Sequence, residues 1–357
     1  MPDFVGGFEL SGAFYFEAVA PLVGDVPHAA GLLGWGSDVL GFDTSRSTDH
    51  GWGPRLQVFV GADHVPVLRD VIEAGLPDEF RGWPTRFGWD DVAVSHHVEI
   101  ASLDDWLRDR LGFNPSEGVP LRDWLSTPQE ILLELTAGAV FHDDVGELAA
   151  VREALAWYPD QVWLWLLACQ WRRIDQEEPF VGRTAEVGDD LGSRVVAARL
   201  VRDLMRLSFL LERRYAPYSK WLGSAFAKLD SHAEIGTALG EVLAADDYDE
   251  REAALVTAVE ALAARHNALG VTSRVDSTVR LFHGRPFRVL GSGRLVDACL
   301  AGVTDPWLKS LPLVGAIDQF VDSTDVLSYP QRFRELCNIY PRWAKPKESS
   351  ADRHRHD

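Results

Sequence analysis

The character of the chain changes near residue 126, and this change constrains the fold more than any other feature of the sequence. Before it, short apolar runs alternate with glycine, aspartate and other turn-forming residues, which indicates short strands and helices joined by tight turns. After it, apolar residues recur at helical spacing over long stretches, most clearly in residues 192–215. We therefore expect an α+β chain with a small mixed sheet and helices over residues 1–125, an α-helical bundle over residues 126–342, and a solvated tail over residues 343–357.

Local patterns refine this expectation. Residues 54–60 (PRLQVFV) and 92–100 (VAVSHHVEI) alternate in polarity and are rich in β-branched residues, so both are predicted strands. Residues 11–30 are mostly apolar and predict a helix that breaks near Pro21, followed by a turn before Pro27. Residues 127–141 (TPQEILLELTAGAVF) predict another helix, because they begin with a capping threonine followed by proline.

Charge and cysteine content limit the class of protein. The 357 residues include 35 Lys and Arg against 54 Asp and Glu, giving a formal net charge of -19, so nucleic acid is an unlikely partner. The three cysteines are widely spaced, which predicts neither a disulfide scaffold nor a thiolate zinc site. The apolar run at residues 162–169 is far shorter than the ~20 residues of a membrane span. The N-terminus is acidic where a signal peptide is basic, so we expect a cytoplasmic protein without a membrane segment.

One glycine-rich segment has a spacing that suits phosphate and metal binding. Gly34-Trp-Gly36-Ser37 is followed, after eleven residues, by Asp49. Glycines let backbone N–H groups approach a phosphate closely, and a serine hydroxyl adds another donor. Asp49 and a later strand acid, Glu99, are suited to hold Mg²⁺ beside that phosphate. From spacing alone, a plain turn, a hairpin and a surface acid explain the same residues.

The order of these residues resembles the DNA polymerase β-like nucleotidyltransferase superfamily, in which Gly-Ser precedes an acid-x-acid pair and a later strand acid. More closely, residues 34–60, with the segment S-x-D-H-x-W-G-P-R, resemble bacterial nucleotidyltransferase-like proteins described only as a domain of unknown function. Further similarity lies in LTAGAVFHDD, EEPFVGR, GDDLGSR and RRYAPYSKWLGSAF, so the resemblance spans most of residues 30–325. It implies a nucleotidyltransferase-like domain in residues 1–125, with Gly36 and Ser37 on the phosphates and Asp49 and Glu99 as catalytic ligands of Mg²⁺ or Mn²⁺.

The sequence departs from that pattern at one position. Two residues after Asp49, where the superfamily has its second carboxylate, stands Gly51. The loss of one ligand leaves a site for a single metal ion, weakens the binding of two ions, or makes the site non-catalytic. His50 offers a nitrogen, which Mg²⁺ accepts poorly, and Asp38 and Asp43 are alternative carboxylates.

The helical half contains a second informative segment, residues 213–221 (RRYAPYSKW). The resemblance implies that Tyr218, Ser219 and Lys220 contact the triphosphate of a bound nucleotide. Arg183, in EEPFVGR, is a further candidate for phosphate binding. The alternative is a helical corner whose aromatic side chains pack together and whose arginines pair with nearby acids.

Other signatures are missing from the sequence. There is no P-loop, no Rossmann glycine pattern, and no P-C-x-x-C after the H-x-E at His97 and Glu99. The expected function is therefore a metal-dependent nucleotidyltransferase that moves a nucleoside monophosphate from a nucleoside triphosphate to a hydroxyl of a small-molecule acceptor, releasing pyrophosphate. A nucleotide-binding pseudoenzyme, which Gly51 favours, and a helical interaction module are the alternatives.

Overall fold

In a computed structural model, residues 2–344 are described, and the chain divides into two compact units. Unit 1 comprises Met1–Pro120 and Gln129–Ala156, and unit 2 comprises Leu121–Pro128 and Trp157–Asp357. The expected boundary after residue 125 falls within a short segment of unit 2 that interrupts unit 1. Most of the expected tail, residues 345–357, lies outside the described part of the chain.

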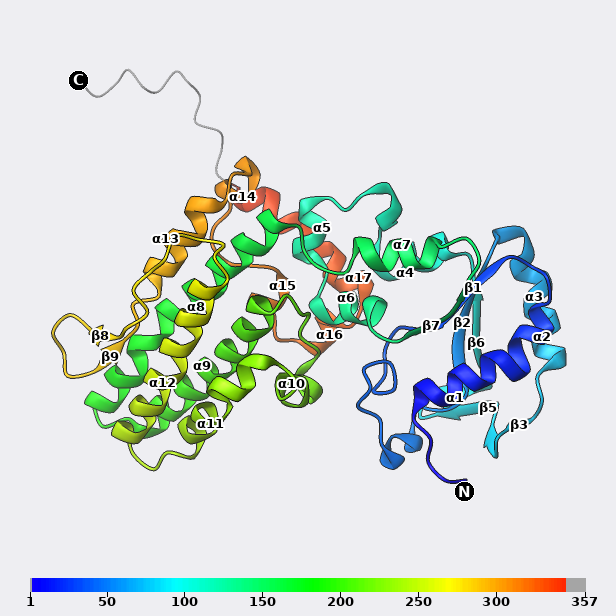
Figure 1. The fold of residues 1–357 in the computed structure, drawn as a ribbon, viewed down its shortest axis with the longest axis horizontal. Helices are drawn as coiled ribbons and strands as arrows, with labels where there is room; N and C mark the ends of the chain where they lie inside the picture. Colours follow the sequence, from blue (N-terminus) through cyan, green and yellow to red (C-terminus); the bar gives the residue numbers. More distant parts are fainter. Residues whose placement is uncertain (1, 345–357) are drawn as a thin grey trace, which may run out of the picture. The chain divides into compact units, whose positions relative to one another are not determined.

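Unit 1 is built on a mixed five-stranded sheet, which agrees with the expected α+β class (Figure 1). The strand order is β5-β6-β2-β1-β7; β2 and β6 are parallel, and the other neighbours are antiparallel. The strands of unit 1 are β1 (His28–Leu32), β2 (Arg55–Val60), β3 (Glu79–Phe80), β4 (Trp83–Pro84), β5 (Arg86–Trp89), β6 (Val92–Ala101) and β7 (Ala139–Asp143). Its helices are α1 (Gly7–Phe14), η1 (Tyr15–Val19), α2 (Ala20–Val23), η2 (Ser45–Asp49), η3 (Ala62–His64), α3 (Val65–Gly75), α4 (Leu103–Leu111), η4 (Pro115–Glu117), α6 (Gln129–Thr136) and α7 (Glu147–Ala154).

The two predicted strands are confirmed as β2 and β6, but two further strands were not predicted. β1 follows the turn predicted before Pro27, which the structure has at residues 24–26, and β7 occupies the end of the expected helix 127–141. Gly138 separates α6 from β7 because its φ of +71° ends the helix and a Cβ there would lie 2.0 Å from the carbonyl oxygen of Leu32. Tertiary pairing with β1 therefore overrides the helical pattern.

The predicted break near Pro21 is wrong. The chain remains helical from α1 through η1 to α2, and η1 is a π-helical segment. Proline has no N–H to donate and its ring excludes the usual carbonyl position, so the wider π turn lets the helix continue through it.

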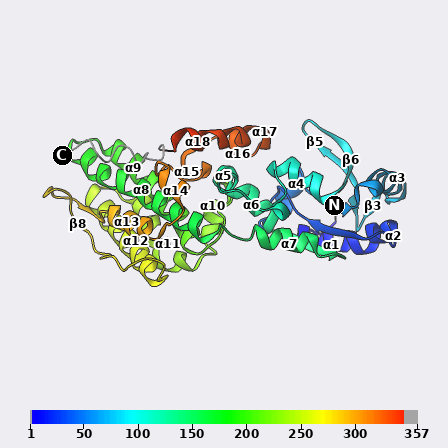
Figure 2. The ribbon, with the colours of Figure 1, turned by 90° about the horizontal axis from the view of Figure 1, so that it is seen from above.

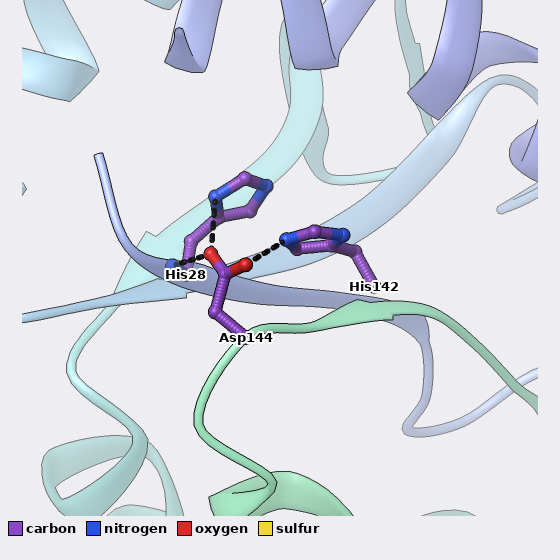
Figure 3. A group of neighbouring side chains, drawn as sticks. All are labelled: His28, His142 and Asp144. Carbon is purple, nitrogen blue, oxygen red and sulfur yellow. Dashed lines mark hydrogen bonds and ion pairs between the residues drawn. The ribbon is translucent and has the colours of Figure 1, made fainter. Parts of the chain in front are cut away.

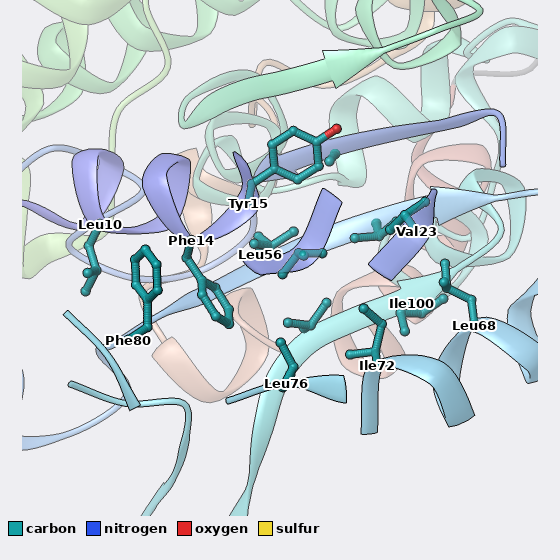
Figure 4. Close-up of a cluster of buried hydrophobic side chains, with 14 of the residues drawn as sticks. Leu10, Phe14, Tyr15, Val23, Leu56, Leu68, Ile72, Leu76, Phe80 and Ile100 are labelled. Atoms are coloured by element: carbon teal, nitrogen blue, oxygen red, sulfur yellow. The ribbon is translucent and has the colours of Figure 1, made fainter. Parts of the chain in front are cut away.

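The apolar core of unit 1 lies between the N-terminal helix, the sheet and α3 (Figure 4). Leu10 and Phe14 on α1 meet Leu56 on β2, and all three are fully buried. Ile72 from α3 and Ile100 from β6 extend the same cluster. At roughly 1.5–3 kcal/mol for each fully buried large side chain, this cluster fixes the sheet to its helices.

Unit 2 is helical. Figures 1 and 2 both show α8, α9, α11 and α12 gathered into a bundle. The long helix α8 is buried throughout residues 162–171, as its nearly all-round apolar sequence predicts. Within residues 2–344 no helix has both the length and the apolar character needed to cross a membrane. The elements of unit 2 are α5 (Leu121–Ser126), α8 (Asp160–Glu186), α9 (Asp190–Leu211), α10 (Ser219–Phe226), α11 (Asp230–Ala244), α12 (Tyr248–Ala268), β8 (Arg280–Leu281), β9 (Arg288–Val289), α13 (Gly293–Gly302), α14 (Pro306–Ser310), α15 (Ile317–Phe320), α16 (Thr324–Leu327), α17 (Pro330–Phe333), η5 (Arg334–Asn338) and α18 (Ile339–Trp343).

Candidate functional site

The glycine-rich turn begins directly after β1. The N–H of Gly34 donates to the carbonyl oxygen of Glu134 on α6, at 3.0 Å. Gly36 has a φ of +128°, and a Cβ there would lie 2.3 Å from an Asp38 oxygen and 2.4 Å from an Arg55 nitrogen. Both the backbone conformation and the close approach of these two side chains require glycine at this position.

A buried ion pair holds the turn against β2. Arg55, the first residue of β2, donates from Nε and from a terminal nitrogen to the two oxygens of Asp38, at 2.8 and 2.7 Å. The same terminal nitrogen donates to the carbonyl oxygen of Trp35, at 2.6 Å. Asp43 is also engaged, because it accepts hydrogen bonds from a backbone N–H of α1 and from Trp52 Nε1. In this structure Asp38 and Asp43, the two alternative carboxylates, therefore make structural hydrogen bonds.

Gln57 connects the start of the turn to Glu99. The parallel register places Gln57 on β2 opposite Glu99 on β6. The amide oxygen of Gln57 accepts from the N–H of Leu33 at 2.8 Å, and its amide nitrogen donates to Glu99 at 3.4 Å. Arg110 on α4 approaches the same Glu99 oxygen, Oε2, with N···O at 3.4 Å. Glu99 is thus half-exposed, oriented by an amide and partly neutralised by a guanidinium.

Glu134 is a titratable group at this turn that the sequence reasoning missed. Burial raises the pKa of its carboxyl to about 8; Arg110 and Arg55 lower it, and Glu130 raises it further. Strongly shifted carboxyls beside a charge partner often mark functional sites. One sequence signal was present, because Glu130 and Glu134 are four residues apart and so share a face of α6 that is otherwise apolar.

Asp49 ends the short helix η2, which is attached to the turn. The hydroxyl of Ser37 donates to the hydroxyl of Ser47 on η2, at 3.3 Å. The Asp49 carboxylate lies 2.7 Å from His50 Nδ1, and its side chain is 59% exposed. Among the described residues, no hydrogen bond or ion pair joins Asp49 to Glu99. The structure therefore links both acids to the turn, each through a different side chain, without joining them directly.

Gly51 lies against an aromatic cluster. Its φ is +62°, and a Cβ there would lie 2.8 Å from the ring of Trp35. The Trp35 ring is 44% exposed and faces Trp89, and Trp89 in turn contacts Phe87 and His97. His97 Nε2 is engaged with the carbonyl oxygen of Phe87, at 2.8 Å. Aromatic rings fill the position where the superfamily pattern has its second carboxylate.

The predicted phosphate-binding residues of the helical half lie at a corner in unit 2. Tyr218 precedes α10, and its hydroxyl accepts a hydrogen bond from Trp221 Nε1 at 2.8 Å. Ser219 and Lys220 are exposed in the first turn of α10, and the Lys220 ammonium lies 5.0 Å from the centre of the Trp221 ring. Arg213 at the same corner pairs with Asp160, as the structural alternative expects.

Arg183 is not brought to this corner. Tyr215, three residues before Tyr218, packs against Tyr158 just before α8, with ring centres 5.3 Å apart. Arg183 lies 23 residues beyond Asp160, the first residue of α8, and at 1.5 Å per residue the helix separates these two positions by about 35 Å. Its guanidinium is exposed and lies 5.6 Å from the Phe180 ring.

Comparison with known proteins assigns no activity to the chain. Residues 124–222, less than a third of the chain, match the family model "Domain of unknown function (DUF4037)". The Gly-Ser turn, Asp49 and Glu99 lie outside the matched segment. The fold is similar to a nucleotidyltransferase-like protein from Exiguobacterium sibiricum, at 10% identity and a TM-score of 0.32 over 84% of this chain and 90% of that one. No curated protein matches the chain.

Proposed function

We propose that this protein is a metal-dependent nucleotidyltransferase that moves a nucleoside monophosphate from a nucleoside triphosphate to a hydroxyl of a small-molecule acceptor. The observation that carries the proposal is the double hydrogen bond of Gln57, which ties the glycine-rich turn to the strand acid Glu99. The link between Ser37 and Ser47 ties the same turn to the short helix that ends at Asp49. Together they support a site in which phosphates lie on the turn between two acids.

The oxygen donors at this turn fit Mg²⁺ or Mn²⁺. The side chains of Asp49 and Glu99 are 59% and 44% exposed, and Ser37 adds a hydroxyl. Divalent cations of this type bind few carboxylates and keep several waters, and when bound they neutralise phosphate charge and orient the triphosphate. Because Trp35 lies where a carboxylate at position 51 would project, we propose one ion rather than two.

In the proposed reaction, the acceptor hydroxyl oxygen forms a bond to the α-phosphorus. The bond from that phosphorus to the β-phosphate bridging oxygen breaks, and pyrophosphate leaves with the electron pair. Glu99 takes the hydroxyl proton, and backbone N–H groups of Gly36 and Ser37 stabilise the phosphate charge.

Further phosphate contacts are proposed for residues of the helical unit. Tyr218, Ser219 and Lys220 offer two hydroxyls and an ammonium for the β- and γ-phosphates. Arg183, near the opposite end of α8, would contact a different part of a substrate. These assignments rest on the resemblance in sequence.

The reaction is tested with nucleoside triphosphates labelled at the α-phosphorus, Mg²⁺ or Mn²⁺, and a panel of aminoglycosides and simple polyols. We expect metal-dependent transfer of label to an acceptor with matching pyrophosphate release, and its loss in Glu99→Gln. Asp104→Asn, in an exposed ion pair on α4, is the matched control and should leave transfer unchanged. Binding of the triphosphate without transfer to any acceptor or to water would contradict the proposed reaction.

A nucleotide-binding protein without turnover is the second candidate, and two observations favour it. Glu99 is partly neutralised by Arg110, and the position of the missing carboxylate is occupied by Trp35. This candidate predicts metal-dependent nucleotide binding with no pyrophosphate release. It is excluded when the wild-type protein releases pyrophosphate and Glu99→Gln does not.

A further inference from the structure

A second polar cluster lies at the opposite end of β1 from the glycine-rich turn. β1 and β7 are antiparallel, with Ala30 opposite His142. The N–H of Asp144 donates to the carbonyl oxygen of His28, so these two residues are also opposite each other. Residues two apart on a strand share a face, and the three polar side chains therefore project from the same face of the sheet.

The three side chains converge on a small volume. His28, His142 and Asp144 each offer one ligand atom, and these atoms lie within 4.8 Å of one another. Figure 3 shows the Asp144 carboxylate beside the two imidazoles, with one oxygen directed toward each ring. One oxygen lies 2.9 Å from His142 Nε2, and the other lies 3.7 Å from His28 Nδ1. The two rings are stacked with their centres 4.4 Å apart.

The longer of these separations suits two ligands of one metal better than a hydrogen bond. A contact of 3.7 Å exceeds the range of an N–H···O hydrogen bond. Two ligand atoms that each lie about 2.0–2.1 Å from a tetrahedral zinc ion are about 3.4 Å apart. A shift of a few tenths of an ångström would therefore give the His28 and Asp144 atoms the spacing of a shared ion.

Tyr15 completes the surroundings of His28, whose side chain is buried. His28 Nδ1 lies 2.7 Å from the carbonyl oxygen of Val26, and Nε2 lies 2.9 Å from the Tyr15 hydroxyl. Without a metal, the proton belongs on Nδ1 and the tyrosine donates to Nε2. A metal on Nδ1 would displace the hydrogen bond to Val26 and move the proton to Nε2, whose N–H would donate to the tyrosine oxygen. A ligating histidine commonly donates its other N–H to such a partner, which fixes the orientation of the ring.

From this geometry we propose that His28, His142 and Asp144 bind a divalent transition metal of the Zn²⁺ class. Two imidazoles and one carboxylate suit zinc or a neighbouring first-row metal and do not suit Mg²⁺, which prefers oxygen. Three protein ligands leave a fourth position open for water or a small anionic ligand. This site differs in donors and in place from the proposed Mg²⁺ site, and its existence does not depend on nucleotidyl transfer.

The test uses full-length protein without a histidine affinity tag, in a His354→Ala/His356→Ala background that removes two histidines near the C-terminus. After chelator treatment, Zn²⁺ is titrated in competition with a chromophoric chelator. We expect one tight site per chain that excess Mg²⁺ does not occupy. His142→Ala and Asp144→Asn should each reduce the Zn²⁺ affinity by more than the roughly 10–100-fold that is typical of losing an outer-shell partner. Tyr15→Phe should weaken it by about 10-fold and keep the stoichiometry.

His232→Ala removes an exposed histidine of unit 2 and serves as the matched control. Circular dichroism establishes that each variant is folded, and Co²⁺ in place of Zn²⁺ reports four-coordinate geometry through its visible absorption. Equal Zn²⁺ affinity in the control, His142→Ala and Asp144→Asn proteins would overturn the proposal. So would the absence of a tight site in folded wild-type protein.

Discussion

Arg55 binds both carboxylate oxygens of Asp38, at 2.8 and 2.7 Å, while its guanidinium lies 4.8 Å from the centre of the Trp35 ring. The pair joins the first residue of β2 to the turn that follows β1, and both side chains are buried. This buried pair therefore helps to fix the turn on which the proposed phosphates lie. It also explains why Gly36 has no room for a side chain.

Removing one partner of this pair should destabilise unit 1 strongly. Asp38→Asn leaves the Arg55 guanidinium buried without its counter-charge, and breaking a buried pair in this way costs about 3–5 kcal/mol. Asp104→Asn breaks the exposed pair with Arg108 on α4 and should cost at most about 1 kcal/mol. Urea denaturation monitored by tryptophan fluorescence measures both. Equal losses in the two variants would contradict a structural role for the buried pair.

Gly36→Ala should be more destabilising than the same change at another glycine with positive φ. At Gly36 the cost of about 1–3 kcal/mol for the backbone conformation is joined by about 1–3 kcal/mol for overpacking against Asp38 and Arg55. Gly118 has a φ of +91°, and a Cβ at that position would meet no atom within 4 Å, so Gly118→Ala isolates the backbone cost. The difference between the two free energies of unfolding measures the crowding at the turn. A difference near zero would show that the ion pair moves aside freely.

The buried carboxyl of Glu134 should make stability depend on pH. Its folded-state pKa is raised from 4.5 to about 8, so the unfolded chain releases this proton at lower pH than the folded chain does. The stability that it contributes is present below pH 4.5 and is lost as the pH rises to about 8. Glu134→Gln removes this loss of stability. Because one pKa unit is worth about 1.4 kcal/mol, the free energy of unfolding of the variant, relative to that of the wild type, should rise by a few kcal/mol from about pH 5 to about pH 8.

Denaturation of both proteins across that pH range gives the comparison. Glu153→Gln, on the exposed face of α7, controls for the loss of one negative charge. A difference between Glu134→Gln and wild type that stays constant with pH would contradict the raised pKa.

Restoring the missing carboxylate should fail for a steric reason. In Gly51→Asp, the new Cβ would lie 2.8 Å from the Trp35 ring, so we expect a stability loss of about 1–3 kcal/mol and no gain in metal-dependent pyrophosphate release. Trp35→Ala removes the ring that blocks this position. In the Trp35→Ala background, Gly51→Asp should therefore cost less stability than it does in the wild-type protein. A rise in turnover in the Gly51→Asp single variant would show that the site accepts a second carboxylate as it stands.

Local patterns predicted part of the fold and failed where pairing partners decide the structure. The β-branched residues of β2 and β6 marked both strands, and the apolar stretch in α8 marked a buried helix. The sequence of β1, HAAGL, has no β-branched residue, and β7 directly follows a helical pattern, so only their pairing with each other and with β2 makes them strands. In the same way, the Gly-Ser turn was visible in sequence, but its ties to Arg55 and Gln57 span 17 and 24 residues and carry no local signal.

The His28 cluster was hidden for a related reason. His142 and Asp144 are close in sequence, but their third partner lies 116 residues away from Asp144, so no spacing motif relates them. Glu134 was obscured because it lies within an amphipathic helical pattern, where an acid is ordinarily exposed.

The central claim is that the turn after β1, with Asp49 and Glu99, binds a metal-complexed nucleoside triphosphate. Calorimetric titration of the full chain with each nucleoside triphosphate, with and without Mg²⁺, tests it most directly. The account predicts saturable binding that needs the metal and weakens at least tenfold in Asp49→Asn and in Glu99→Gln, but not in Asp104→Asn. Absence of binding by folded protein, or equal affinity in all four proteins, would contradict it.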